Sequence, residues 1–258
     1  MKTSTPATGP ASGKGSALAE VWPLSPLQEG MLFHAGFGDQ GPDVYVIQRT
    51  LTIDGPLDAD RWHASWQALL GRHAALRASF HRRKSGEAVQ LVSREAVLPW
   101  RETDLSGLPE ADALAEVERL AAGECAERFD LGRAPLLRVL LVRLGAERHC
   151  MVLTAHHILL DGWSMPILFD EATTAYAAGG DASVLRRTAS YRDYLAWLGR
   201  QDKEAARAAW RAELAGDGEP TLVAPADPAR TPSCPTRPRP TCPRPSPAPS
   251  PTWPAATA

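Results

Sequence analysis

The chain has 258 residues, of which 44% are hydrophobic and 22% are charged, and its formal net charge is -2. This length and apolar content suffice for one sizeable core, or for a domain with a tail. The near-neutral charge argues against a nucleic-acid-binding protein. No apolar run approaches the roughly 18 residues that a membrane-spanning helix needs.

The first 20 residues are small and polar, and we expect residues 1–20 to form a disordered leader. They lack the apolar stretch of a secretory signal peptide. A docking or targeting element is the alternative interpretation. The four cysteines show no CxxC spacing, which argues against a zinc site and indicates free thiols in a reducing, cytoplasmic setting.

The middle of the chain alternates between strand-like and helix-like patterns. Apolar, β-rich runs predict strands at residues 44–53, 87–93, 97–105, 135–144 and 149–158. Apolar side chains at helical spacing predict helices at residues 57–76, 109–126, 166–178, 190–199 and 203–214. This order of elements predicts an α/β or α+β fold with one mixed sheet flanked by helices.

Local signals mark the ends of two of these helices. Asp58 or Asp60 is available to cap the first helix, whose apolar face includes His73. Ser164 can cap the helix that starts near residue 166, and the Gly179–Gly180 pair is expected to end it.

The composition changes near residue 217. Residues 225–258 hold 12 of the 23 prolines and contain no Leu, Ile, Val, Met or Phe. Such a segment cannot bury enough apolar surface to offset its ordering entropy, so we expect a disordered tail. One hypothesis is a proline-rich linker or SH3-type ligand. The other is a domain sequence that has lost its reading frame.

Two adjacent histidines, His156 and His157, stand at the end of the last expected strand. Adjacent side chains of a strand point to opposite faces, so the two imidazoles cannot share one role. One can support the core while the other faces a cleft, where neutral imidazole can both donate and accept a proton. A core histidine beside a solvated one is the plainer interpretation. A metal site with Asp161 is disfavoured by the same opposite-face argument.

The stretch "HHILLDG" at 156–162 matches the pattern HHxxxDG and resembles the active-site signature of condensation domains of nonribosomal peptide synthetases, which are related to chloramphenicol acetyltransferase. Three other stretches resemble motifs of that family in the same order: "PLSPLQEGMLFHA" (23–35), "RHAALRASF" (72–80) and "YRDYLAWLGRQ" (191–201). The second has Ala78 where threonine is usual. The resemblance covers residues 21–224 and implies one lobe, the N-terminal one, of a two-lobed fold similar to chloramphenicol acetyltransferase.

The resemblance also implies a reaction. Condensation domains join two thioester-bound substrates, each carried on the phosphopantetheine arm of a donor or acceptor carrier protein. The acceptor amine attacks the donor thioester carbonyl. His157 is then the catalytic residue, which either takes the proton or positions the amine, and the backbone N–H of Gly162 is a candidate oxyanion donor. The chain itself is expected to bind no cofactor and no metal.

The neighbours of the catalytic histidine receive supporting roles from the same resemblance. His156 is expected to be structural. Asp161 is expected to pair with Arg72, or failing that with Arg77, because a buried carboxylate needs a cationic partner. A solvated helix-end charge is the alternative for Arg77. Trp163 either lines the tunnel between the lobes or packs in the core.

The rest of the family pattern bears on subtype and completeness. Gln28 and His34 of the first motif are expected to be structural rather than catalytic. The segment "DGWSMPI" after the histidines resembles peptide-bond-forming domains that accept an L-configured donor. The later motifs and the second lobe are missing, so we expect a truncated condensation domain that is inactive alone. The alternatives are a non-catalytic fragment or carrier-protein-binding module, and a stand-alone acyltransferase that uses CoA.

Overall fold

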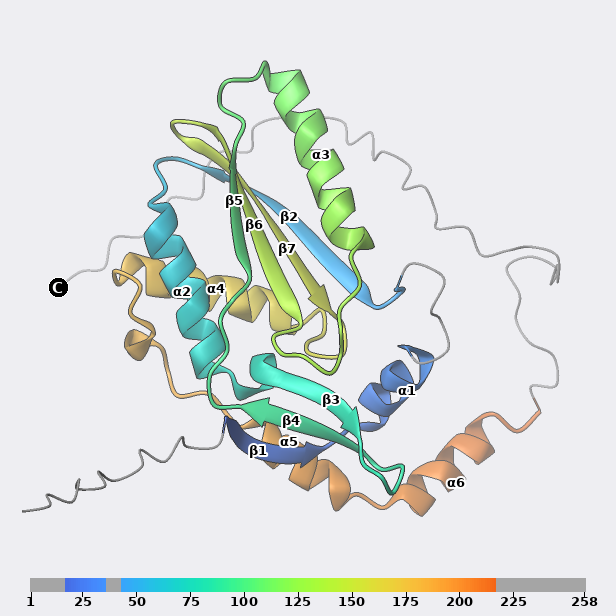
Figure 1. Ribbon diagram of the computed structural model, residues 1–258. Helices are drawn as coiled ribbons and strands as arrows, with labels where there is room; N and C mark the ends of the chain where they lie inside the picture. Colours follow the sequence, from blue (N-terminus) through green and yellow to red (C-terminus); the bar gives the residue numbers. More distant parts are fainter. Residues whose placement is uncertain (1–16, 36–42, 217–258) are drawn as a thin grey trace, which may run out of the picture. The chain divides into compact units, whose positions relative to one another are not determined.

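The computed structural model describes residues 17–35 and 43–216 (Figure 1). The expected tail at 225–258 and most of the expected leader lie outside these residues. The strands are β1 (Leu18–Pro23), β2 (Val46–Asp54), β3 (Ala78–Arg82), β4 (Ala88–Ser93), β5 (Trp100–Asp104), β6 (Leu137–Gly145) and β7 (Arg148–His156). The helices are α1 (Pro26–Ala35), α2 (Ala59–Arg72), α3 (Glu110–Ala126), α4 (Ser164–Ala177), α5 (Tyr191–Gly199) and α6 (Lys203–Glu213), with short 3-10 turns η1 (Ala74–Arg77) and η2 (Ala182–Val184).

The chain divides into two units, Met1–Trp210 and Arg211–Ala258, and both sheets lie in the first. The larger sheet is mixed, with the order β2-β7-β6-β5. Its β5–β6 pair is parallel and its other pairs are antiparallel. The smaller sheet, β1-β4-β3, is wholly antiparallel. The expectation of a flanked mixed sheet is confirmed, but the expectation of one sheet is wrong.

Two short strands account for the second sheet. β1 begins at Leu18, inside the stretch interpreted as leader, and ends at Pro23. A proline in a short run weakens the sequence signal of a strand. β3 follows directly on a helix that was expected to continue to residue 76. That helix ends at Arg72, and η1 turns the chain into β3. β1 and β3 pair with β4 on either side. β4 was predicted from the sequence, and its two partner strands were not.

Strand alternation gives the larger sheet two apolar faces. Odd-numbered residues of β6 and β7 pack with α2 and α4; these include Leu137, Val139, Leu141, Met151, Leu153 and Ala155. Even-numbered residues pack with α3; these are Leu140, Val142, Cys150 and Val152. In Figure 1, α3 lies beside the larger sheet at a different place from α2 and α4. The same alternation decides which way each histidine at the end of β7 faces.

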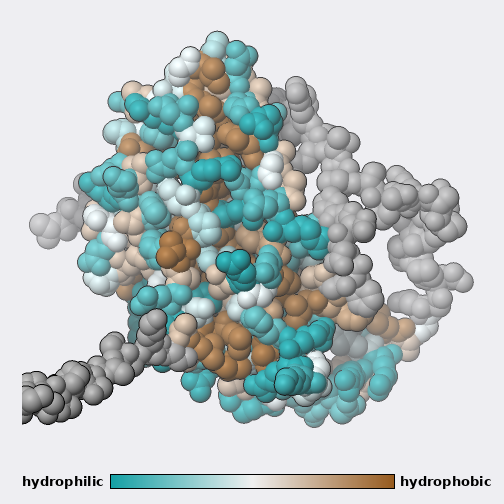
Figure 2. Space-filling view, viewed as in Figure 1, coloured by the Kyte–Doolittle hydropathy of each residue, from teal (hydrophilic) through white to brown (hydrophobic). Residues whose placement is uncertain are grey.

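A third core joins the smaller sheet to the loop after β7. Trp22, Phe80 and Val92 pack there with Ile158. Ile158, which follows His157, therefore packs against the smaller sheet, whereas β7, the strand before His157, belongs to the larger sheet. Figure 2 shows hydrophobic side chains gathered at the level where Figure 1 draws this smaller sheet, and Leu18 is among the exposed apolar residues of β1.

Candidate active site

His157 lies just beyond β7, and backbone carbonyls of other residues hold both its main chain and its side chain. Its main-chain N–H donates to the carbonyl of Tyr45 at 2.8 Å. Its ring nitrogen Nδ1 lies 2.8 Å from the carbonyl oxygen of Leu160. A carbonyl can only accept, so Nδ1 carries the hydrogen and the neutral ring keeps its lone pair on Nε2. Nε2 has no hydrogen-bond partner within the described ranges, so it is available to a substrate.

His157 lines a cavity of about 640 Å³ between the two sheets' flanking helices. The other lining residues come from α1 and the turn before it, from the segment after α2 that includes η1, from the loop after β7, and from α4 and α5 with the loop before it. They include Gln28, Met31, His73, Leu76, Leu160, Leu168, Tyr191 and Tyr194. The lining is mostly apolar with a few polar groups, which is the usual character of a small-molecule site.

His156 faces the other side of the sheet and is fully buried. Its Nδ1 accepts the main-chain N–H of Ile158 at 3.1 Å, so its hydrogen is on Nε2, which lies 3.3 Å from Oδ2 of Asp43. The centroid of its ring lies 6.1 Å from that of Tyr45 and 6.5 Å from that of Phe129. Burial lowers the pKa of His156 more than the Asp43 carboxylate raises it. This imidazole is therefore a neutral structural residue that shapes the loop carrying its neighbour.

We expect the free energy of unfolding to fall as the pH drops below about 6.5, the ordinary pKa of histidine. Burial lowers the folded-state pKa of His156, so the unfolded chain takes up the proton first. The stabilising contribution is complete above the ordinary pKa and is lost as the pH falls toward the folded-state pKa, by up to about 1.4 kcal/mol per pH unit. Urea unfolding at a series of pH values measures this slope.

His156→Asn is the matched variant, because an asparagine oxygen can still accept the Ile158 N–H. Its slope should be smaller than that of the parent. His149, whose pKa burial also lowers, contributes the slope that remains. A His156→Asn variant with the full parental slope would contradict this account of the buried imidazole.

The expected ion pair of Asp161 with an arginine is wrong. The Asp161 side chain is exposed, and its Oδ1 accepts the main-chain N–H of Ser164 at 2.9 Å and the hydroxyl of Ser164 at 2.7 Å. The hydroxyl hydrogen bond is the main reason that the pKa of Asp161 is lowered. The Asp161 side chain, rather than that of Ser164, therefore accepts the main-chain hydrogen bond at the start of α4. An exposed carboxylate can be satisfied by such local donors without any arginine.

Both arginines expected as partners of Asp161 bind elsewhere. Nε of Arg72 lies 3.4 Å from Oε2 of Glu171 on α4, and its guanidinium also donates to the carbonyl of Arg186. Arg77 donates to main-chain carbonyls, at 3.0 Å for Ser93 and 2.6 Å for Leu70. Arg77 is therefore not a freely solvated helix-end charge; it joins the end of α2 to β4.

Gly162 and Trp163 lie in the exposed turn before α4. A Cβ placed on Gly162 would meet nothing within 4 Å among the described residues, so the local fold does not itself demand glycine there. Trp163 is 85% exposed, and its expected alternative role in core packing is wrong. The lining of the cavity that contains His157 includes neither residue. The oxyanion role of Gly162 and the tunnel role of Trp163 remain predictions.

Gln28 has the structural place expected of it and also lines the cavity. Its side chain donates at 3.0 Å to the carbonyl of Ile158 and accepts at 3.0 Å from the amide of Gln90 on β4. It thereby fixes the loop after His157 to the smaller sheet. His34 is exposed, and its Nδ1 lies 2.6 Å from the Tyr45 hydroxyl.

One cavity residue has a role that sequence reasoning missed. His73 was counted on the apolar face of a helix, but it follows the last residue of α2 and lines the same cavity as His157. Its Nε2 lies 2.5 Å from Oε2 of Glu171. The signal that could have revealed it is the Arg-His pair at the point where helical spacing ends, combined with an acidic residue on the helix after the histidine motif.

The family model described as the condensation domain matches residues 18–237, which is most of the chain. The chain belongs to the condensation-domain family. The match begins within the expected leader and runs into the proline-rich segment. Within the described ranges, no group of three or more His, Cys, Asp or Glu side chains could hold a metal ion. Nor does any helix there have the length and apolar character to cross a membrane.

Curated relatives of this condensation domain are large synthases. It is 35% identical over 214 residues to a linear gramicidin synthase polypeptide of Brevibacillus parabrevis, covering 82% of this chain and 3% of that protein. It is 34% identical over 214 residues to bacitracin synthase 3 of Bacillus licheniformis, covering 81% of this chain and 3% of that protein. The chain thus spans a small fraction of the synthases that it matches.

Solved structures show the same fold. The first condensation domain of the calcium-dependent antibiotic synthetase, in complex with a substrate analogue, superposes with a TM-score of 0.68 at 24% identity and is matched over 49% of its length. The starter condensation domain of rhizomide synthetase superposes with a TM-score of 0.65 at 18% identity and is matched over 50% of its length. The present chain therefore corresponds to about half of a solved condensation-domain chain.

Proposed function

We propose that this condensation domain forms an amide bond between two thioester-linked substrates, with His157 as its catalytic residue. The observation that carries the proposal is the fixed tautomer of His157. Its Nδ1–H is donated to Leu160, and its Nε2 lone pair has no partner among the described residues. A histidine held in this way within a largely apolar cavity can accept a proton from an attacking amine.

In the proposed step, the amine nitrogen of the acceptor attacks the thioester carbonyl carbon of the donor, so a C–N bond forms and the C–S bond breaks. The proton lost by the amine passes to Nε2 of His157 or directly to the departing thiolate, which leaves as the thiol. A free α-amine has a pKa of about 8, so the demand for a strong base is modest, and orientation supplies much of the rate.

The partners proposed for this step are donor and acceptor carrier proteins, which present the substrates on phosphopantetheine arms. The chain would bind no cofactor of its own. The relatives are named as linear gramicidin synthase and bacitracin synthase, which supports this choice over a CoA-dependent acyltransferase. We also propose a reducing, cytoplasmic setting, which the free thiols of Cys125 and Cys150 support.

We expect the 258-residue chain alone to form amide no faster than uncatalysed aminolysis. Its cavity is open to water, because Leu27, Ile167 and Tyr194 line it and are 79%, 57% and 46% exposed. Water screens the developing charge, and an open wall does not hold two arms in attacking geometry. The same chain extended with the C-terminal half of a solved condensation domain should turn over loaded carrier proteins. Mass spectrometry of the products measures both rates.

Two outcomes would contradict the proposal. An extended chain that binds loaded carrier proteins but makes no amide would favour a non-catalytic carrier-binding module. An extended chain that acylates a free amine from CoA, and ignores loaded carriers, would favour a stand-alone acyltransferase. Turnover by the unextended chain would instead show that one lobe suffices.

A further inference from the structure

We propose that His73 is a second substrate-binding residue of the cavity, which accepts a hydrogen bond from an amide N–H of the pantetheine-linked substrate. The inference rests on the proposed function, because it assumes that this cavity receives a pantetheine arm. His73 and His157 line the same cavity from different elements. His73 lies just beyond the end of α2, and His157 just beyond the end of β7.

The orientation of His73 is fixed by Glu171. Nε2 of the imidazole lies 2.5 Å from Oε2 of this carboxylate, and both side chains are mostly shielded, at 18% and 15% exposure. Nε of Arg72 lies 3.4 Å from the same oxygen of Glu171. The arginine already supplies the positive charge that the carboxylate needs. A carboxylate oxygen can only accept, so the hydrogen of the imidazole lies on Nε2, facing Glu171.

This tautomer leaves the lone pair on Nδ1. That nitrogen has no hydrogen-bond partner in residues 17–35 and 43–216, and it is not among the fully buried polar atoms that lack one. Nδ1 of His73 is therefore not fully buried, and the residue to which it belongs lines the cavity. A lone pair on a mostly apolar wall favours an N–H donor, and a pantetheine arm carries amide N–H groups along its length.

If His73 had only a structural role, its contact with Glu171 through Nε2 would account for that role. The His73–Glu171 contact joins the end of α2 to α4, two helices that pack against each other. A glutamine at position 73 can place an amide donor near the position of Nε2 and keep this contact. An asparagine can place an oxygen near the position of Nδ1 but does not reach Glu171. The two substitutions therefore separate the role in the fold from the role in binding.

The test measures binding of an aminoalkyl pantetheine thioether to the 258-residue chain. In this probe a methylene replaces the thioester carbonyl, so it cannot react. We expect His73→Gln to keep the parental stability in urea but to raise the dissociation constant about tenfold. We expect His73→Asn to be less stable but to bind within about threefold of the parent. Nitrogen-15 NMR of the parent should show the Nε2–H tautomer at His73.

The control is His81→Gln. His81 lies on β3, contacts Ser79 at 3.0 Å and is not part of the cavity lining, so its replacement should leave affinity unchanged. If the affinities of both His73 variants simply follow their stabilities, His73 is structural and the inference is overturned while the proposed function stands. If the parent chain does not bind the probe at all, the inference and the placing of a pantetheine arm in this cavity fail together.

Discussion

Replacing His157 with alanine in the chain extended by a C-terminal half should slow amide formation about 10²–10⁴-fold. Because Nδ1–H of His157 is donated to the Leu160 carbonyl at 2.8 Å, the ring's lone pair is on Nε2. Alanine removes that lone pair. Dipeptide release from two loaded carrier proteins, followed in single turnover, separates the chemical step from carrier binding. The loss should appear in the chemical step.

His157→Asn provides the matched comparison. Asparagine can still donate to the Leu160 carbonyl from near the position of Nδ1 but has nothing at the position of Nε2. It should be as inactive as His157→Ala and closer to the parent in unfolding free energy. An asparagine variant with parental turnover would show that the ring serves only to hold the loop, and the catalytic assignment would then be lost.

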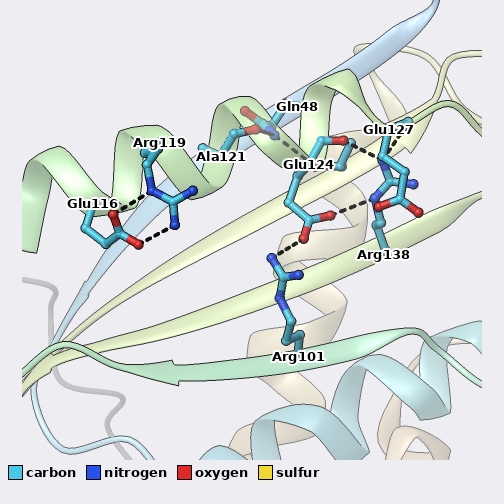
Figure 3. Close-up of polar contacts among 9 residues, drawn as sticks. Gln48, Arg101, Glu116, Arg119, Ala121, Glu124, Glu127 and Arg138 are labelled. Carbon is cyan, nitrogen blue, oxygen red and sulfur yellow. Dashed lines mark hydrogen bonds and ion pairs between the residues drawn. The ribbon is translucent and has the colours of Figure 1, made fainter.

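Replacing Glu124 with alanine should lower the free energy of unfolding by about 3–5 kcal/mol. The Glu124 side chain is 8% exposed and connects α3 to two strands of the larger sheet. Its two carboxylate oxygens lie 2.6 Å from Arg101 on β5 and 2.7 Å from Arg138 on β6 (Figure 3). Arg138 is itself only 13% exposed, so removing Glu124 leaves a shielded guanidinium without its counter-charge.

The same helix offers a control glutamate in a more exposed ion pair. Glu116 and Arg119 form an ion pair at 2.6 Å on α3, with side chains that are 31% and 69% exposed (Figure 3). Exposed pairs of this kind contribute little, because water screens them and both side chains lose rotamer freedom. Glu116→Ala should therefore leave the denaturation midpoint almost unchanged. Equal losses from the Glu116 and Glu124 variants would contradict the expectation that burial decides how much each ion pair contributes.

The sequence predicted the larger sheet better than the smaller one. β6 and β7 are long apolar runs whose alternation is shared with two packed faces, so their pattern is strong. β1 and β3 have six and five residues, and each is completed only by pairing with β4. That pairing is a contact between distant segments, which no local pattern records. The strong local signal of α2 also extended the predicted helix past its end at Arg72.

The candidate site shows the same division. Adjacent positions on a strand must face opposite ways, so the different surroundings of His156 and His157 followed from the sequence. The pairing of Asp161 did not follow, because it depends on whether the carboxylate is buried. It is exposed, and Ser164, three residues away, satisfies it. The contact of His73 with Glu171 joins residues 98 positions apart and was beyond any spacing argument.

The position of Ile158 makes the site sensitive to partial unfolding of either sheet. His157 is bonded through its main chain beside β2, while Ile158 packs in the core of the smaller sheet and its carbonyl is held by Gln28. Opening either sheet alone would release one side of the imidazole. We therefore expect the main-chain amide of His157 to exchange its hydrogen when the larger sheet opens, while opening of the smaller sheet displaces Ile158, so that catalytic competence ends with whichever opening occurs first.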